Sequence, residues 1–427
     1  MFKTLANAWR IPELRKKLIF TLFVLLLYRV GYVIPVPFVD TAAMGTYFQQ
    51  SLSTTILGLY NAMSGSAFSQ ASVLALGIQP YINASIIIQL LTVAIPALGR
   101  MAKDDGQAGK KKIERITRYT TVGLGLLLGF AYYTMINSNN ILLATDTTPE
   151  LLRAIVIILS FTAGSSLVMW LGEQITEHGI GNGISVILFA NIIAGLPSMV
   201  STMASGAFLW WHLVIICVVV LLLVLFIVFI NDAERRIPIQ YAKRVVGRKV
   251  YGGQSTNLPI KVSMSGVMPV IFAQSIASIP ATICAFIPGA TQNNWWYDNV
   301  FQSTSWIYCV IYGLLIFFFS WFYSTIQYDP VEIANNLKNS GGFIPGFRAG
   351  KPTADFIKKV ISKILVFGAL YLAIVALLPM IGNILLPNAQ YLAIGGTSII
   401  IVVGVALETV KSLEAQMLMR HYKGFLD

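Results

Sequence analysis

Residues 210–230 read WWHLVIICVVVLLLVLFIVFI, a run without Asp, Glu, Lys or Arg. An α-helix needs about 20 mostly apolar residues to cross the hydrocarbon core of a bilayer, where the backbone must satisfy its own hydrogen bonds. The run meets this requirement over its whole length. We therefore predict a membrane-spanning helix here.

The whole chain has the composition of a membrane protein. Its 427 residues have a mean hydropathy of +0.72 and only 11% are charged, which is too apolar for a water-soluble protein of this size. We predict an all-α integral membrane protein whose ten spans cover residues 18–36, 73–98, 116–137, 151–172, 184–204, 210–230, 264–287, 305–326, 360–382 and 390–410. Only the short polar stretch 172–183 separates the fourth span from the fifth.

Lys and Arg are concentrated in a few segments. Of the 30 basic residues, 28 lie in residues 1–17, 100–118, 231–263, 327–363 and 411–427. Cytoplasmic segments of membrane proteins accumulate basic residues, so ten spans place both termini and these three loops in the cytoplasm. The net charge of +12 then faces anionic lipids and cytosolic partners rather than nucleic acid.

Ionisable residues are nearly absent from the predicted spans. Arg29, Glu173 and Glu408 lie near helix ends, where we interpret them as side chains that snorkel to the interface. Metal-binding, nucleophile-elbow and complete phosphate-loop motifs are also missing. We therefore expect no catalytic residue, no metal and no cofactor.

Two further segments carry local patterns. Residues 2–10 have helical spacing of apolar residues beside Lys3 and Arg10, which indicates an amphipathic helix in the membrane interface, with a helix partner as the alternative. Residues 41–71 are uncharged and mildly apolar but too short to span. Such backbone is tolerated at membrane depth only when protein or water surrounds it, so we predict a re-entrant segment.

A short motif occurs once in each half of the chain. Residues 77–84, GIQPYINA, and 266–273, GVMPVIFA, share Gly-x-x-Pro-x-Ile-x-Ala. The motif favours an inverted repeat of residues 1–204 and 205–427, with the Gly and Pro breaking a helix beside a cavity. The branched side chains in these two helices indicate either ordinary packing or a hydrophobic constriction that seals a pore.

Several longer strings resemble the SecY family, the central subunits of protein-translocation channels. The strings are WLGEQITEHGIGNGIS at 170–185, GIQPYINASIIIQ at 77–89, RRI at 235–237, YAKR at 241–244, QSTNLP at 254–259, ANNLK at 334–338 and FIPGFR at 343–348. The resemblance implies ten helices in two inverted halves around a central pore, a lateral gate toward lipid and an exterior plug. It implies a channel that passes unfolded secretory proteins across the cytoplasmic membrane and releases hydrophobic segments into the bilayer.

The resemblance also implies roles for particular residues. The pore ring would comprise Ile78, Ile82, Leu188, Ile271 and Ile401. The plug would span about residues 55–68 and include Leu57, Leu59, Tyr60 and Met63. Polar contacts across the lateral gate would come from Ser85, Gln89 and Gln274, for which ordinary hydrogen bonding between helices is the alternative.

The expected partners follow from the same resemblance. Lys243, Arg244, Arg248, Lys249 and Arg348 match positions that dock the ribosome or the SecA motor ATPase, although they also suit anionic lipid. Membrane subunits SecE and SecG, signal peptides and unfolded polypeptides complete the expected set. A secondary transporter would need a coupling carboxylate near the midplane and an intramembrane enzyme would need a nucleophile or metal set, and the sequence offers neither.

Overall fold

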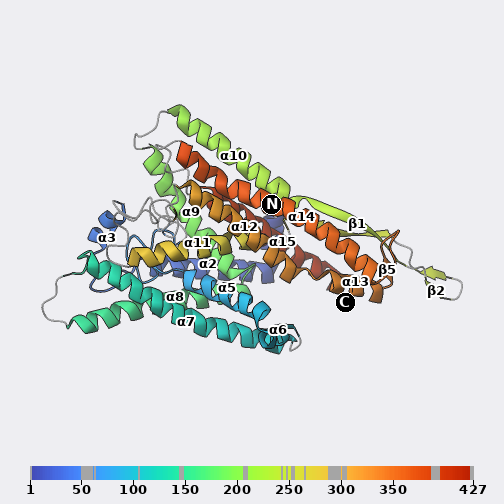
Figure 1. The fold of residues 1–427 in the computed structure, drawn as a ribbon, viewed down its shortest axis with the longest axis horizontal. Coiled ribbons are helices and arrows are strands. Elements are labelled where there is room, and N and C mark those ends of the chain that lie inside the picture. The colour runs from blue at the N-terminus through green and yellow to red at the C-terminus, as the bar shows by residue number, and fades with distance from the viewer. Residues whose placement is uncertain are drawn as a thin grey trace.

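The computed structural model describes residues 2–49, 61, 64–103, 106–143, 149–204, 210–241, 244–246, 249–251, 255–263, 266–286, 300, 305–385 and 395–423. Its long helices form a bundle that runs roughly along the longest axis of the molecule (Figure 1).

Ten helices correspond to the ten predicted spans. They are α2 (Pro12–Val33), α5 (Gln79–Ala94), α7 (Gly106–Ser138), α8 (Glu150–His178), α9 (Gly183–Ala204), α10 (Trp210–Asp232), α11 (Met268–Phe286), α12 (Trp306–Gln327), α14 (Lys351–Leu385) and α15 (Gly395–Lys423). In the described part of the chain, five segments are long and apolar enough to cross a membrane by themselves, and Gly183–Gly195, Cys217–Asp232 and Met268–Pro280 are shorter apolar helices. The prediction of a helical membrane protein is confirmed.

The fourth and fifth spans are separate helices, as predicted. Helix α8 ends at His178 and α9 begins at Gly183. A Cβ atom at Gly183 would lie 1.9 Å from the carbonyl oxygen of Gly172. The chain can reverse this tightly only because residue 183 lacks a side chain.

The second span differs from its predicted range of 73–98. The helix α5 begins only at Gln79, ends at Ala94, and is followed by the separate helix α6 (Pro96–Lys103). Residues 64–78 form a series of turns in which Phe68, Ala71 and Leu74 are buried. Hydropathy does not distinguish buried turns from a helix, since both consist of apolar residues.

The predicted re-entrant segment is partly visible. It contains the short helix α3 (Thr41–Tyr47), which the Asp40 side chain caps by accepting hydrogen bonds from two backbone amides. The turns over residues 64–71 lie inside the protein, as non-helical backbone at membrane depth requires.

The N-terminal helix α1 (Phe2–Arg10) packs on another helix. Its Ala8 is fully buried in a small cluster with Leu14 of α2, Ile180 and Leu413 of α15. The contact with α15 therefore matches the alternative that the sequence left open, a helix partner.

Two of the basic loops contain a small β-sheet, which the all-α prediction omits. Strand β1 (Glu234–Tyr241) pairs antiparallel with β4 (Ser255–Lys261) and with β5 (Gly342–Phe343), and a smaller hairpin joins β2 (Arg244–Val246) to β3 (Lys249–Tyr251). The sheet packs with α13 (Pro330–Asn339) and the start of α14 around Ile237, Ile239, Ile260, Leu337, Ile344 and Ile357. These loops therefore have a hydrophobic core of their own.

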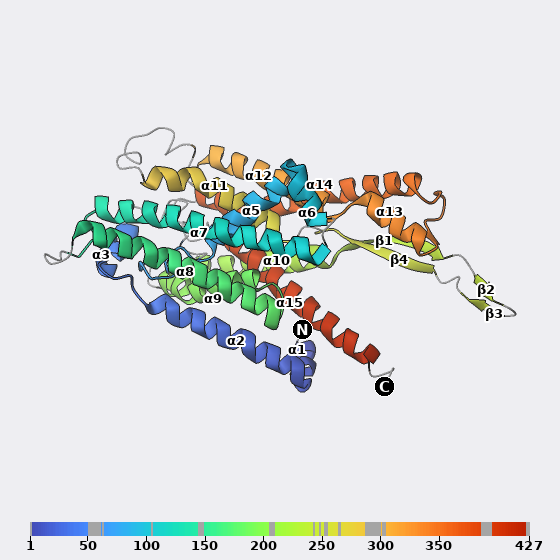
Figure 2. The ribbon, with the colours of Figure 1, turned by 90° about the horizontal axis from the view of Figure 1, so that it is seen from below.

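Two of the basic loops lie at one end of the molecule. Figures 1 and 2 place the β1–β4 hairpin and α13 at that end and α3 at the other, whereas α6 and the marked N-terminus lie nearer the middle of the long axis and the C-terminus lies toward the hairpin. Helix α5 runs toward the basic end, whereas α11 follows the hairpin and runs away from it (Figure 2).

Candidate functional site

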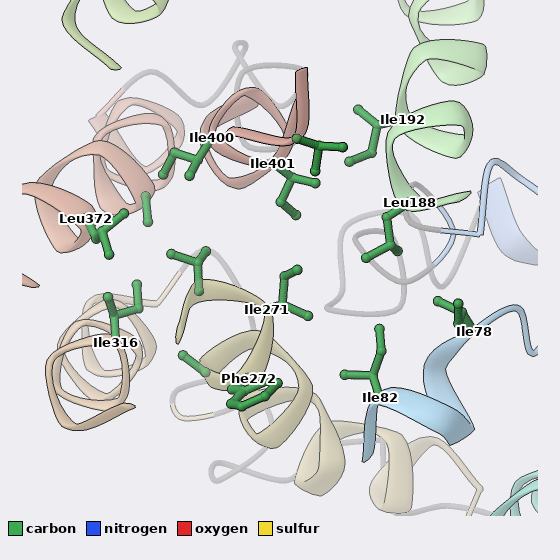
Figure 3. Close-up of a cluster of buried hydrophobic side chains, with 14 of the residues drawn as sticks. Ile78, Ile82, Leu188, Ile192, Ile271, Phe272, Ile316, Leu372, Ile400 and Ile401 are labelled. Atoms are coloured by element: carbon green, nitrogen blue, oxygen red, sulfur yellow. The ribbon is translucent and has the colours of Figure 1, made fainter. Parts of the chain in front are cut away.

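Five predicted ring residues lie together in the largest hydrophobic cluster. They are Ile78 at the start of α5, Ile82 of α5, Leu188 of α9, Ile271 of α11 and Ile401 of α15, and each exposes at most 4% of its surface. Figure 3 shows that Ile82, Leu188, Ile271 and Ile401 point toward one another from four different helices. Four helices therefore contribute aliphatic side chains to one buried cluster.

The repeated motif determines where two of these side chains lie. Gly77 and Gly266 both have a positive φ, +53° and +59°, and a helix begins shortly after each of them. The motif prolines then stand near the helix start, where a missing amide hydrogen leaves no acceptor unpaired. Ile82 and Ile271 consequently lie near the beginnings of α5 and α11. The expectation that Gly and Pro interrupt a helix is thus corrected, because both motifs start one.

A further residue of this cluster escaped the sequence analysis. Ile192 lies one helical turn after Leu188 on α9, is buried, and belongs to the same cluster. Figure 3 shows it beside Ile401 and Leu188. The i, i+4 spacing from Leu188 would have identified it, since such residues share a helix face.

Neighbouring isoleucines on α15 have different surroundings. Ile400 and Ile401 are both buried, at 2% and 1% exposure. Ile401 lies toward Leu188 and Ile271, whereas Ile400 lies toward Leu372 of α14 (Figure 3). Ile400 is therefore a packing residue, and burial alone does not define the constriction.

The three predicted gate residues lie on α5 and α11. Ser85 and Gln89 line a cavity of about 150 Å³ between α5 and α7, together with Tyr81, Thr92 and Glu114. Gln274 is buried on α11, which packs against both α5 and α7. Among the hydrogen bonds of the described residues, none joins Gln274 to Ser85 or Gln89. Nearby, Glu173 pairs with Arg118 at 2.8 Å, so its carboxylate has a partner within the protein rather than only interfacial water.

The predicted plug and docking residues are only partly described. Leu57, Leu59, Tyr60 and Met63 lie outside the described residues, as do Lys243 and Arg248. Arg244 begins β2 and Lys249 begins β3, at the tip of the long hairpin (Figure 2). Arg348 is exposed in the loop between β5 and α14, and its carbonyl accepts a hydrogen bond from the Thr353 hydroxyl at 2.8 Å.

The described part of the chain contains no group of three His, Cys, Asp or Glu side chains placed to hold a metal ion. Its largest buried cluster consists mainly of aliphatic and aromatic side chains.

Comparison with known proteins identifies relatives over the full chain. A family model described as SecY matches residues 72–410. The protein translocase subunit SecY of Streptomyces galbus is 44% identical over 440 residues, covering 100% of both chains, and that of Thermotoga maritima is 40% identical over 432 residues, covering 100% of this chain and 98% of the relative.

Solved structures share the fold. One described as a protein conducting channel has a TM-score of 0.67 at 18% identity, covering 94% of this chain and 92% of the other. Sec61 in a canine ribosome-channel complex from the endoplasmic reticulum has a TM-score of 0.63 at 17% identity, with the same coverage.

Proposed function

The chain belongs to the SecY family, and we propose that Ile78, Ile82, Leu188, Ile271 and Ile401, with Ile192, form the seal of its pore. The protein is a protein-conducting channel, a multi-pass protein of the bacterial cell membrane and not an enzyme. The observation that carries the proposal is the convergence of these buried side chains from four helices (Figure 3).

The chemistry of the ring suits a seal that must also open. Aliphatic side chains offer water and ions no hydrogen bonds, so a narrow ring of them blocks ion flow by dewetting. Leu188 has the same volume as isoleucine and fits the same role. An unfolded polypeptide would push these side chains apart without breaking any polar contact between them.

The plug would cover this seal from the exterior. We place it at about residues 55–68, including Leu57, Leu59, Tyr60 and Met63. In support, the chain emerges from this stretch into the buried turns of residues 64–78 and reaches Ile78 of the ring directly.

Lateral release would occur where α5 and α7 meet α11 and α12. The contact of α11 with α5 and α7 supports a seam at this place, and Ser85, Gln89 and Gln274 would adjust how readily it opens. Apolar segments of a passenger would partition through the open seam into lipid, since no polar backbone would be exposed by a helical segment that leaves.

The two halves, residues 1–204 and 205–427, would be related by an inverted repeat. The opposite directions of α5 and α11, each started by the same motif, support this relation. The position of β1, β4, β5 and α13 at the end opposite α3 supports a cytoplasmic position of loops 231–263 and 327–363, and the basic residues near both termini support the same side for the termini.

The basic loops would dock cytosolic partners. Lys243, Arg244, Arg248, Lys249 and Arg348 would face the ribosome or the SecA motor, whose acidic or phosphate groups suit Arg and Lys. Two solved structures of similar fold are described as ribosome complexes, which supports this surface. SecE and SecG would bind within the membrane, signal peptides and unfolded polypeptides would occupy the pore, and anionic lipids would surround the basic end.

Site-specific crosslinking tests the pore assignment. A photoreactive residue replaces Ile82 or Ile271, and a secretory precursor is stalled during transport. Both positions should crosslink to the precursor. A matched probe at Ile87, which is exposed on the same helix, should crosslink to lipid instead. Precursor crosslinks confined to the exterior surface would refute threading through the ring.

A further inference from the structure

Arg29 is a charged side chain inside the N-terminal membrane helix. It lies near the C-terminal end of α2. It is one of only two basic residues outside the five basic segments. A charge at membrane depth is costly and persists where it has a task. Snorkelling was the expected explanation, but the side chain has specific partners within the protein.

The first partner is the helix that carries two ring residues. The Nη2 group of Arg29 donates a hydrogen bond of 3.0 Å to the carbonyl oxygen of Ala190. Ala190 lies in α9 between Leu188 and Ile192, within the turn that presents both to the constriction. Arg29 therefore contacts the backbone of the helical turn that carries Leu188 and Ile192.

The second partner is a segment of residues 64–72, which overlaps the C-terminal end of the proposed plug and continues beyond it; we call it the anchor segment. A Cβ atom at Gly65 would lie 3.4 Å from Nη1 of Arg29 and 3.3 Å from the side-chain oxygen of Asn191. Gly65 has a φ of +67°, so a left-handed backbone without a side chain brings the anchor segment against the guanidinium. The guanidinium thus donates a hydrogen bond to α9 and lies beside Gly65 of the anchor segment.

Hydrogen bonds and aromatic packing hold the anchor segment in place. Its Ser69 amide donates to the Asn61 side chain at 2.9 Å, and its Ser66 amide donates to the Asn61 carbonyl at 2.7 Å. On the opposite side, the Tyr132 hydroxyl of α7 donates to the Phe68 carbonyl, and the two rings are 4.6 Å apart. The anchor segment is therefore held by Asn61 on one side and by α7 on the other.

The charge of Arg29 is held without a carboxylate. Its guanidinium lies over the ring of Tyr32 at 5.2 Å, and none of the ion pairs among the described residues involves it. A planar group with several donors can stack on a ring and serve two neighbours at once, which an ammonium group does less well.

We infer that Arg29 is a positioning residue of the closed channel, which ties the ring-bearing turn of α9 to the anchor segment so that ring and plug close together. This inference rests on the proposed seal. It assigns to Arg29, a residue outside the pore, the role of holding the ring and the plug in fixed positions relative to each other.

Resting ion conductance of the complete translocase in planar bilayers tests the inference. Arg29→Met should raise it about tenfold, since the proposed link between α9 and the anchor segment then loses the hydrogen bond that the charged group donates to Ala190. The conductance of Arg29→Lys should lie between those of the parent and of Arg29→Met, because lysine retains the positive charge but lacks the several N–H donors of the guanidinium. Arg153→Met, which removes the other isolated basic residue, should conduct like the parent.

A second variant separates positioning from general damage. Gly65→Ala should also raise the conductance, and in the Arg29→Met background it should add less than it does alone, because both changes disrupt one contact. Additive effects, or a conductance of Arg29→Met equal to the parent, would overturn the inference.

Failure of the inference is distinguishable from failure of the seal. The ring variant Ile401→Ala is measured in parallel. If it leaks while Arg29→Met stays tight, the seal stands and the positioning role is wrong. If neither leaks, the seal itself is wrong. Equal membrane abundance of Arg29→Met and Arg29→Lys, with a smaller leak from Arg29→Lys, excludes misfolding as the cause.

Discussion

Ile82 and Ile271 occupy equivalent positions in two helices that run in opposite directions. Each follows a positive-φ glycine by five residues and a proline by two, and each is buried in the central cluster. The same local backbone, used once before α5 and once before α11, thus places one isoleucine of each helix in this cluster. This relationship explains why the motif occurs twice in a chain of otherwise dissimilar halves.

Two neighbouring isoleucines allow the seal to be tested within one helix. We expect Ile401→Ala to raise resting ion conductance, because it shortens a side chain that lies toward Leu188 and Ile271 (Figure 3). Ile400→Ala removes the same atoms from an equally buried site that faces Leu372. It should therefore lower the free energy of unfolding by about 2–5 kcal/mol without increasing the leak. Equal conductance of the two variants would contradict the assignment.

A larger change should give a larger leak. With Ile82, Ile271 and Ile401 all replaced by Gly, the ring loses aliphatic bulk on three helices and water can enter it. Ion flux from salt-loaded vesicles should rise well above that of any single variant. An unchanged flux would remove these residues from the seal.

Ile192 should contribute to the seal although the sequence analysis missed it. Ile192→Ser should increase ion flux, since it puts a hydroxyl beside Leu188 in the constriction. Ile193→Ser is the control, because Ile193 is 39% exposed and turned away from this cluster. A leak of the same size from both would point to general destabilisation of α9.

Two deletions of different length test the plug. Removal of residues 53–60 should leave a channel that closes poorly but folds normally, because it retains Asn61 and the anchor segment. Removal of residues 53–68 also deletes Phe68, which is packed against Tyr132, and should lower the melting temperature as well. Conductance and thermal unfolding measured on both separate the two effects. A tight channel after the shorter deletion would count against the plug.

Close packing at the start of α9 gives a prediction about stability. Gly183→Ala would place a Cβ atom 1.9 Å from the Gly172 carbonyl oxygen, which forces α8 and α9 apart and should lower the amount of folded protein strongly. Gly195→Ala lies in the same helix with no atom within 4 Å, and should be neutral or stabilising by up to about 1 kcal/mol. Thermal unfolding of the purified complexes measures both; equal melting temperatures would show that α8 and α9 tolerate separation here.

The sequence by itself determined the number of membrane helices and predicted their orientation. The number of helices depends on stretches of about 20 residues that are apolar enough to enter lipid, and the orientation depends on which loops contain Lys and Arg. Both are properties of short stretches of sequence, so neither requires knowledge of tertiary contacts. The resemblance to a known family brought Ile78, Ile82, Leu188, Ile271 and Ile401 together before any contact was known.

Only the tertiary structure decided which buried groups face one another. Ile400 and Ile401 are identical in type and burial, and their surroundings differ because different helices lie on the two sides of α15 (Figure 3). The sheet in the basic loops arises from pairing between strands far apart in the chain. Arg29, expected to snorkel, instead reaches Ala190, since the position of α9 offers its guanidinium a carbonyl within the protein.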